Sequence, residues 1–222
     1  MTDQRMLARI AGALYLLTFA TSIPALALKQ PFLEGGGSAA AAQWAALLEL
    51  VLALACIGTA VALYPVVRQR NEALALGFVA SRTLEAAAVF AGVVSLLSVV
   101  SIRGAGVVDG GAGSEALRML TLMHDWAFLV GPGLMPAVNA LLLGSLLYRY
   151  RLVPRVIPLI GLIGAPLLTI STLAALFGVL DQVSPLAGLL ALPIALWEFS
   201  VGAWLLVRGL LAVAPRVSAQ AE

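Results

Sequence analysis

Seven polar or ionisable residues stand inside long apolar runs of this chain, where a bilayer would surround them. They are Arg82, Glu85, Asn139, Glu198, Glu49, His124 and Asp125. A charged side chain near the centre of a bilayer costs about 2.5–3.5 kcal/mol on insertion scales, so such residues are rare and indicate a functional site. Their guanidinium, carboxylate, amide and imidazole groups can form ion pairs, bind a polar ligand or transfer a proton.

Arg82, Asn139 and Glu198 are predicted to lie at one depth in the membrane. Each is ten residues from a charged residue at the same side of the bilayer, namely Glu72, Arg149 and Arg208. This corresponds to about 15 Å, half of the hydrocarbon thickness. We therefore predict an Arg82–Glu198 ion pair, with Asn139 accepting hydrogen bonds from the remaining guanidinium N–H groups.

A second predicted cluster comprises Glu49, His124 and Asp125, in the outer third of the bilayer. Glu85 lies three residues after Arg82 on nearly the same helix face. It can join this arginine or point toward the second cluster, and we predict the second. The two clusters together predict a polar cavity that narrows from the outer surface to a charge-paired floor. For Glu49 and for the His124–Asp125 pair, a place at the membrane interface is an equal alternative.

The composition predicts the elements that must position these residues. Of the 222 residues, 62% are hydrophobic and 11% are charged, against about 25% charged in soluble domains, which indicates an integral membrane protein. We predict an all-α fold, a bundle of six transmembrane helices that forms a single domain over residues 1–222. Each apolar run exceeds the ~20 residues that a helix needs to cross a bilayer, and none alternates as a membrane strand would. The predicted spans are 7–28, 43–67, 73–100, 117–148, 156–180 and 186–211.

The fourth predicted span is too long for a straight helix across the bilayer. Residues 117–148 would extend about 48 Å. Gly131-Pro132-Gly133 near the middle predicts a kink, because proline removes a backbone hydrogen bond that neighbouring helices can replace.

Basic residues are distributed unevenly between the two sets of alternating helix ends. One set holds nine arginines: Arg5, Arg9, Arg68, Arg70, Arg149, Arg151, Arg155, Arg208 and Arg216. The other set holds Lys29, Arg103 and Arg118. By the positive-inside rule, both termini are predicted to be cytoplasmic. A cleavable signal peptide is an alternative for the first run, but its length of about 18–20 residues exceeds the usual 7–15.

The counts of histidine and cysteine exclude several kinds of site. A single histidine rules out a tri-histidine zinc site and bis-histidine haem ligation within a monomer. A single cysteine rules out an intrachain disulfide and a CxxC metal site. Neither a serine-hydrolase elbow nor a basic patch for nucleic acid occurs. Whether His124 and Asp125 bind a metal stays open, since adjacent helical side chains diverge by about 100°; we assign no metal, cofactor or nucleic-acid partner.

Blocks of sequence along the chain resemble a known family. They are Asn71–Gly77 leading to Arg82 and Glu85, His124–Phe128 with Gly131–Gly133, Asn139–Gly144, Arg151–Arg155 with Gly161–Gly164, and Trp197-Glu198 before Gly202. Over nearly the whole chain these blocks resemble the bacterial and archaeal multi-pass membrane family known as domain of unknown function 4386. The resemblance implies a six-helix integral protein of a bacterial plasma membrane and no established activity.

Three functions are compatible with these residues. The favoured one is a small-molecule or proton-linked binding or transport protein, whose ligand occupies the outward-facing polar cavity. The alternative is a structural or regulatory membrane protein whose buried ion pairs only fix helix packing. The least favoured is an intramembrane enzyme with His124 and Asp125 as a general-base pair, so no catalytic residue is assigned. The predicted partners are the lipid bilayer and a small-molecule ligand in the outward-facing polar cavity; the sequence leaves the identity of the ligand and the oligomeric state open.

Overall fold

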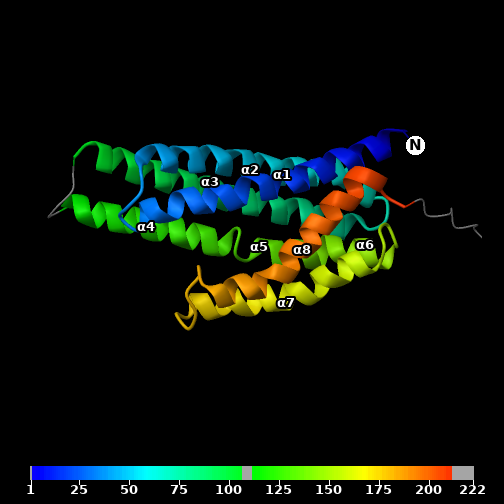
Figure 1. Cartoon of the computed structure of the whole chain (residues 1–222). Helices are drawn as coiled ribbons and strands as arrows, with labels where there is room; N and C mark the ends of the chain where they lie inside the picture. Colours follow the sequence, from blue (N-terminus) through cyan, green and yellow to red (C-terminus); the bar gives the residue numbers. More distant parts are fainter. Residues whose placement is uncertain (1, 107–111, 212–222) are drawn as a thin grey trace, which may run out of the picture.

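The computed structural model describes residues 2–106 and 112–211, and every regular element among them is a helix (Figure 1). Six stretches of these residues are long and apolar enough to cross a membrane, so the predicted number of spans is confirmed. The elements are α1 (Thr2–Leu33), α2 (Ala39–Val67), α3 (Glu72–Gly104), α4 (Ala112–Val130), α5 (Met135–Asn139), the π-helix η1 (Ala140–Gly144), α6 (Ser145–Arg149), α7 (Val156–Leu176) and α8 (Pro185–Arg208).

The helix ends follow local sequence signals more closely than the limits of the apolar runs. α1 and α3 begin before and end after their predicted spans, because polar residues continue each helix beyond its apolar stretch. α7 ends at Leu176 rather than at residue 180, and Gly178 turns the chain with a φ of 69°. α2, α3 and α8 begin at side-chain caps, in which an oxygen accepts a hydrogen bond from a backbone N–H of the first turn. The capping residues are Ser38, Asn71 and Ser184.

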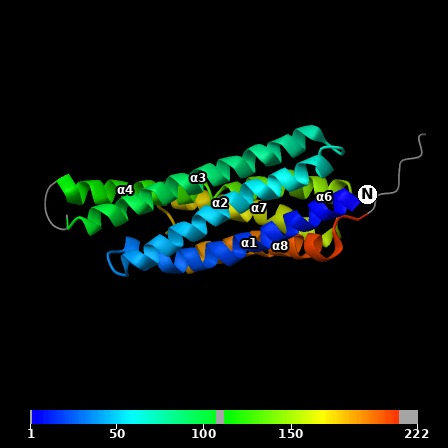
Figure 2. The same cartoon turned by 90° about the horizontal axis from the view of Figure 1, so that it is seen from above.

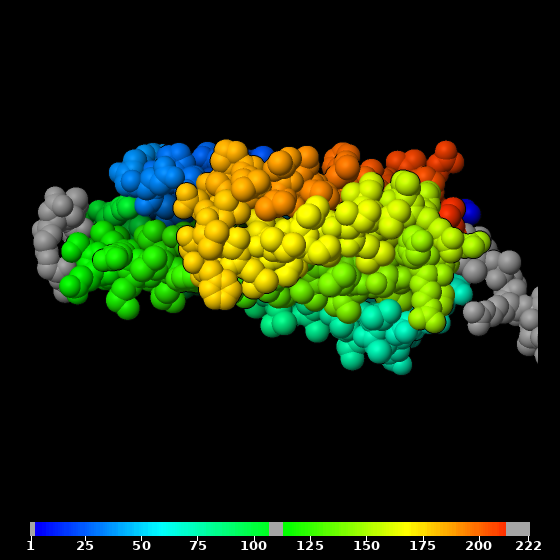
Figure 3. Space-filling view, turned by 90° about the horizontal axis from the view of Figure 1, so that it is seen from below, coloured from blue at the N-terminus to red at the C-terminus, as the bar shows by residue number. Residues whose placement is uncertain are grey.

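The helices pack as an antiparallel bundle in chain order. α1 packs on α2, α2 on α3 and α3 on α4, while α7 and α8 form a hairpin against α1 and η1 (Figures 1 and 2). The start of α1 and the end of α8 lie at one end of the bundle, which we call the basic end, and we call the opposite end the far end. The α7–α8 hairpin stops short of the far end of α1 to α4 (Figure 3). The described arginines of the basic end are Arg5, Arg9, Arg68, Arg70, Arg149, Arg151, Arg155 and Arg208.

The helix of the fourth span is interrupted at the position where a kink was predicted. A turn over residues 131–134 separates α4 from α5, and η1 follows α5 directly. Glycine is needed within the turn, since a Cβ on Gly133 would lie 2.4 Å from the carbonyl oxygen of Leu129. The carbonyl of Gly133 accepts a hydrogen bond of 2.7 Å from the hydroxyl of Thr172 on α7. A neighbouring helix thus satisfies part of the interrupted backbone, as an apolar environment demands.

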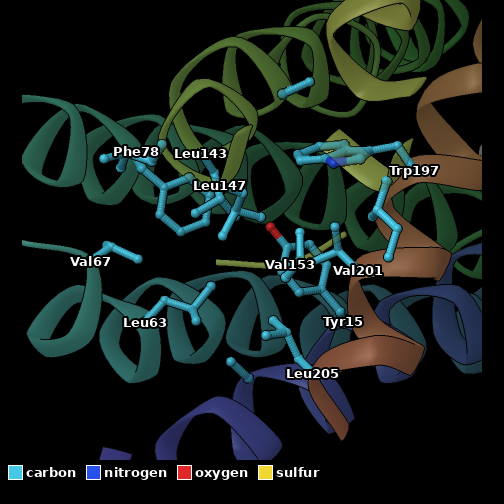
Figure 4. Packing of buried hydrophobic residues seen from close by; sticks show 14 of the residues in the cluster. Tyr15, Leu63, Val67, Phe78, Leu143, Leu147, Val153, Trp197, Val201 and Leu205 are labelled. Carbon is cyan, nitrogen blue, oxygen red and sulfur yellow. The ribbon is translucent and has the colours of Figure 1, made fainter. Parts of the chain in front are cut away.

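Two hydrophobic clusters fill the bundle along its length. The cluster toward the basic end draws side chains from α1, α2, α3, η1, α6, α7 and α8, with Trp197 among the largest (Figure 4). The cluster toward the far end comes from α1, α2 and α3 and consists mainly of alanine and valine, whose small size lets helices approach closely. Along α3, Phe78 belongs to the first cluster and Ala86 to the second. Arg82 and Glu85 therefore lie between the two.

The outer faces of the helices are apolar. Large hydrophobic side chains such as Leu54, Leu84 and Val94 are more than half exposed. Contact with the lipid bilayer covers such side chains in a membrane protein, since acyl chains are as apolar as leucine.

Close contacts fix α8 near the basic end. A Cβ on Gly12 of α1 would lie 2.4 Å from the backbone nitrogen of Leu206, and one on Gly161 of α7 would lie 2.5 Å from the ring of Trp197. Small residues are typical of such helix crossings in membranes. Toward the far end, α8 diverges from α1 (Figure 1). The two helices therefore enclose a wedge that opens away from the basic end.

Candidate functional site

Arg82 is the centre of a buried polar network. Its side chain is 1% exposed, and its Nη1 donates to Glu85 Oε2 at 2.9 Å. The same Nη1 lies 3.5 Å from Glu198 Oε1, so the predicted Arg82–Glu198 ion pair is confirmed. The guanidinium lies 4.8 Å from the centroid of the Tyr15 ring, and Nη1 also donates to Cys56 Sγ at 3.7 Å. Side chains of α1, α2, α3 and α8 thus meet at one arginine.

Asn139 binds Glu85 rather than Arg82. Its Nδ2 donates at 2.7 Å to Glu85 Oε2, the oxygen that also accepts from Arg82. The prediction that Asn139 accepts from the guanidinium is therefore wrong, as is the prediction that Glu85 points toward the outer cluster. Asn139 does lie at the level of the Arg82 network in the bundle, but the turn at residues 131–134 and the wider turns of η1 alter which way successive side chains of this span face.

The network contains two carboxylates for one guanidinium. Glu85 accepts from two donors, whereas Glu198 has only the 3.5 Å contact, and among the described residues its Oε1 has no hydrogen-bond partner. Over the same residues Arg82 Nε and Nη2 also have none. A net charge in an apolar interior is costly. Glu198 is therefore the group of this network at which a proton or a cation can be accommodated.

A hollow of about 270 Å³, which we call the inner hollow, adjoins the network. It lies in the wedge between α1 and α8, and Arg82, Glu85 and Glu198 line its polar side. The remaining walls are mostly apolar, with Phe19 of α1 and Ile194 of α8 among them. A ligand in this hollow would contact the charged groups and the apolar walls together.

Two further hollows continue from the inner one toward the far end. The middle hollow, of about 420 Å³, shares lining residues with the inner hollow: Pro132, Leu168 and Ala191. The far hollow, of about 250 Å³, shares lining residues with the middle one: Leu26, Phe128, Gln182 and Val183. The three hollows therefore form a series that passes the break in the fourth span and ends at the buried network.

The far hollow is lined by four ionisable side chains: Lys29, His124, Asp125 and Asp181. Lys29 forms an ion pair with Glu49, both side chains being buried. The Lys29 ammonium also lies 4.5 Å from the centroid of the Phe128 ring. From its position after the first apolar run, Lys29 was expected to be a charge of the loop. It is instead an interior residue, since it is only 2% exposed.

His124 and Asp125 do not form the pair that a general base would require. His124 Nδ1 lies 3.0 Å from the carbonyl oxygen of Gly92, and the described residues show no hydrogen bond between the two side chains. The side-chain amide of Gln182 contacts the backbone nearby. In the orientation that satisfies its nitrogen and its oxygen, it donates to the backbone carbonyl of Asp125 (3.3 Å) and accepts from the backbone N–H of Leu129 (3.0 Å). Within residues 2–106 and 112–211, no three His, Cys, Asp or Glu side chains come together as metal ligands.

The model of one protein family, Domain of unknown function (DUF4386), matches residues 10–209, which reach into all six spans. The chain belongs to the DUF4386 family. No curated protein and no solved structure matches the sequence. The family description names no activity, so the function of this DUF4386 member is inferred from the side chains of the site.

Three residues of this DUF4386 chain, two in the Arg82 network and one at the far hollow, were not among the predicted site residues. They are Lys29, Tyr15 and Cys56. Cys56 and Arg82 both lie well inside their spans, so a depth count would have placed them near each other. The sequence has no signal that turns Cys56 toward the arginine rather than toward lipid.

Proposed function

We propose that this protein binds or transports a small molecule in a proton-linked manner, at a site formed by Arg82, Glu85, Asn139 and Glu198. The observation that supports this most is the unequal charge of the network beside a hollow. Two carboxylates face one guanidinium, and the less engaged carboxylate, Glu198, lines the inner hollow. Buried charges of a purely structural kind are expected to be balanced, because an unpaired one costs several kcal/mol.

Glu85 and Glu198 have different roles in this proposal. Glu85 balances Arg82 and is held by the Asn139 amide as well. Glu198 exchanges a proton for a cationic group of the ligand, because its contact with Arg82 is the longer of the two. Ionisable residues within membrane spans commonly act in this way in transporters.

The remaining predicted residues belong to the route toward this site. His124 and Asp125 line the far hollow, and Glu49 holds Lys29 at its edge. We propose that the far end faces outward, with both termini cytoplasmic in a bacterial plasma membrane and the chain forming one domain. The excess of arginine at the basic end supports this orientation; Arg216 lies outside the described residues, and the burial of Lys29 removes a cation from the opposing set.

Ligand-dependent stabilisation tests the proposal. The purified protein would be screened by thermal unfolding against small organic cations, anions and neutral compounds. Compounds that raise the melting temperature of the wild type should lose most of this effect in Glu198→Gln and keep it in Glu115→Gln, a matched change at an exposed glutamate of α4. Full retention of the effect in Glu198→Gln would show that the site is assigned wrongly.

A structural role is the second candidate, favoured by the position of Arg82 between the two hydrophobic clusters. In that case its ion pairs fix how α3 and α8 face each other. The exchange Arg82→Glu with Glu198→Arg should then restore most of the stability lost in either single variant, and no compound should depend on Glu198 for its effect.

A further inference from the structure

We infer that the ligand is a lipophilic organic cation, with its positive charge beside Glu198 and its apolar body in the middle hollow. This inference rests on the proposed function and names the chemical class of its ligand. Its basis is the combination of charge at the two ends of the hollow series with apolar walls between them.

The inner hollow favours positive charge. Glu85 and Glu198 line it with Arg82 as their common counter-ion, which leaves one formal negative charge in excess. Nη1 of Arg82 donates to Glu85 and the guanidinium lies against the Tyr15 ring, while Nε and Nη2 have no partner among the described residues. The two carboxylates nevertheless outnumber the one cation. An anionic ligand would therefore meet two carboxylates here, whereas an ammonium or phosphonium would restore neutrality.

Glu198 is also the less engaged of the two carboxylates, since its Oε1 has only the 3.5 Å contact with Arg82 Nη1. The residue is 9% exposed, and its Oε1 has no hydrogen-bond partner among the described residues. The ring of Phe19 lines the same hollow. Aromatic faces attract organic cations as well as apolar groups.

The middle hollow favours an apolar body. Most of its lining is leucine, phenylalanine, proline, alanine and glycine. Two of its hydroxyl residues are already engaged: Thr172 donates to the carbonyls of Gly133 and Leu168, and Ser184 caps α8. Its volume of about 420 Å³ falls in the range of ~300–1,000 Å³ typical of small-molecule sites.

The far hollow favours the approach of cations. Asp125 and Asp181 line it, while its one lysine, Lys29, is already paired with Glu49. With Lys29 offset by Glu49, the two aspartates leave this hollow with an excess of negative charge, and such an excess raises the local concentration of cations. A cation that enters from the far end therefore meets carboxylates first, apolar walls next and Glu198 last.

Two probes of equal shape and opposite charge test this inference. Tetraphenylphosphonium and tetraphenylborate would be titrated separately into the protein in lipid nanodiscs, with empty nanodiscs as the blank. Equilibrium binding and the shift in melting temperature would both be measured. Saturable binding of the phosphonium and none of the borate is expected. Equal binding of both probes, or no saturable binding of the phosphonium, would overturn the inference.

Three variants locate the binding site. Glu198→Gln should weaken phosphonium binding by roughly tenfold or more, as expected when one partner of a desolvated charge pair is removed. Gly188→Phe should also weaken it, because a Cβ on this residue of the middle hollow meets no atom within 4 Å and the ring can fill the space. Glu115→Gln should bind as the wild type does. Unchanged binding in both of the first two variants would place the phosphonium elsewhere and refute the site.

The outcome for the ligand class can be separated from the outcome for the proposed function. If neutral or anionic compounds stabilise the wild type through Glu198 while the phosphonium does not bind, the proposed function stands and the cation class is wrong. If the phosphonium binds the wild type and Glu198→Gln equally, and no compound depends on Glu198 for its stabilising effect, both are wrong.

Discussion

Arg82 and Lys29 are both buried cations of this bundle, yet the carboxylates around them differ. Lys29 has one partner, Glu49, on the helix that follows its own in the chain. Arg82 has two partners, Glu85 on its own helix and Glu198 on the last helix. The first arrangement is balanced and joins sequence neighbours, whereas the second has excess negative charge and joins distant helices. The comparison separates a charge-matched pair from a network in which carboxylates outnumber cations.

The largest effect is expected from removal of the shared cation. Arg82→Met leaves Glu85 and Glu198 buried without a counter-ion, and it should lower the free energy of unfolding by about 3–5 kcal/mol. Thermal unfolding in detergent measures the loss. The triple variant Arg82→Met with Glu85→Gln and Glu198→Gln should recover most of it, since no charge is then left unpaired. A triple variant as unstable as the single one would contradict the charge argument.

Removal of the carboxylate at the balanced pair should have the next largest effect. Glu49→Gln leaves Lys29 without its partner and should cost about 3 kcal/mol, the low end for a broken buried pair, because a long lysine stem can carry its charge toward the interface. Adding Lys29→Met should restore stability in the same unfolding measurement. Failure of this rescue would mean that the pair is not an independent unit.

The matching change at the unequal network should be nearly neutral. Glu198→Gln leaves Glu85 to balance Arg82, so the free energy of unfolding should fall by less than about 1 kcal/mol or rise slightly. The comparison with Glu49→Gln is the sharpest one available, because the chemical change is the same. A loss as large as that of Glu49→Gln would show that the two regions do not differ in the way proposed.

A further small effect concerns the break in the fourth span, which separates the two regions. Thr172→Val removes the hydrogen bond to the Gly133 carbonyl and should cost about 1 kcal/mol. Thr169→Val is the control, because its hydroxyl bonds only within α7, to Ala165. Hydrogen exchange at residues 131–135 should rise in the first variant and not in the second. Equal exchange in both would show that α7 does not support the break.

The six spans and the depth of Arg82, Asn139 and Glu198 could be predicted because both depend on length along a helix. The rise per residue is constant, so a count from the helix end gives the level in the membrane. The Arg82–Glu198 contact follows from that count and from opposite charge.

The direction in which a side chain faces could not be predicted in the same way. Asn139 lies between the turn at residues 131–134 and η1, so a regular helical count from either end of the span gives the wrong angular position with little error in level. For Lys29, the count along the helix gave the wrong level of the charged group. Glu49 lies farther from its helix end than Lys29 does, and the flexible lysine stem spans the difference in depth.

The close contact of Gly12 with α8 has a mechanical consequence. A Cβ on Gly12 would lie 2.7 Å from the carbonyl oxygen of Gly202, near the narrow end of the wedge between α1 and α8. From Gly202 to its start at Pro185, α8 forms a lever arm of about 25 Å. A rotation of about 5° around this fulcrum would move the far end of α8 by roughly 2 Å. Glu198, only about one turn from the fulcrum, would move by about a quarter of that distance. A small change in the distance between Glu198 and Arg82 would thereby accompany a larger movement of α8 at the far end, beside the middle and far hollows.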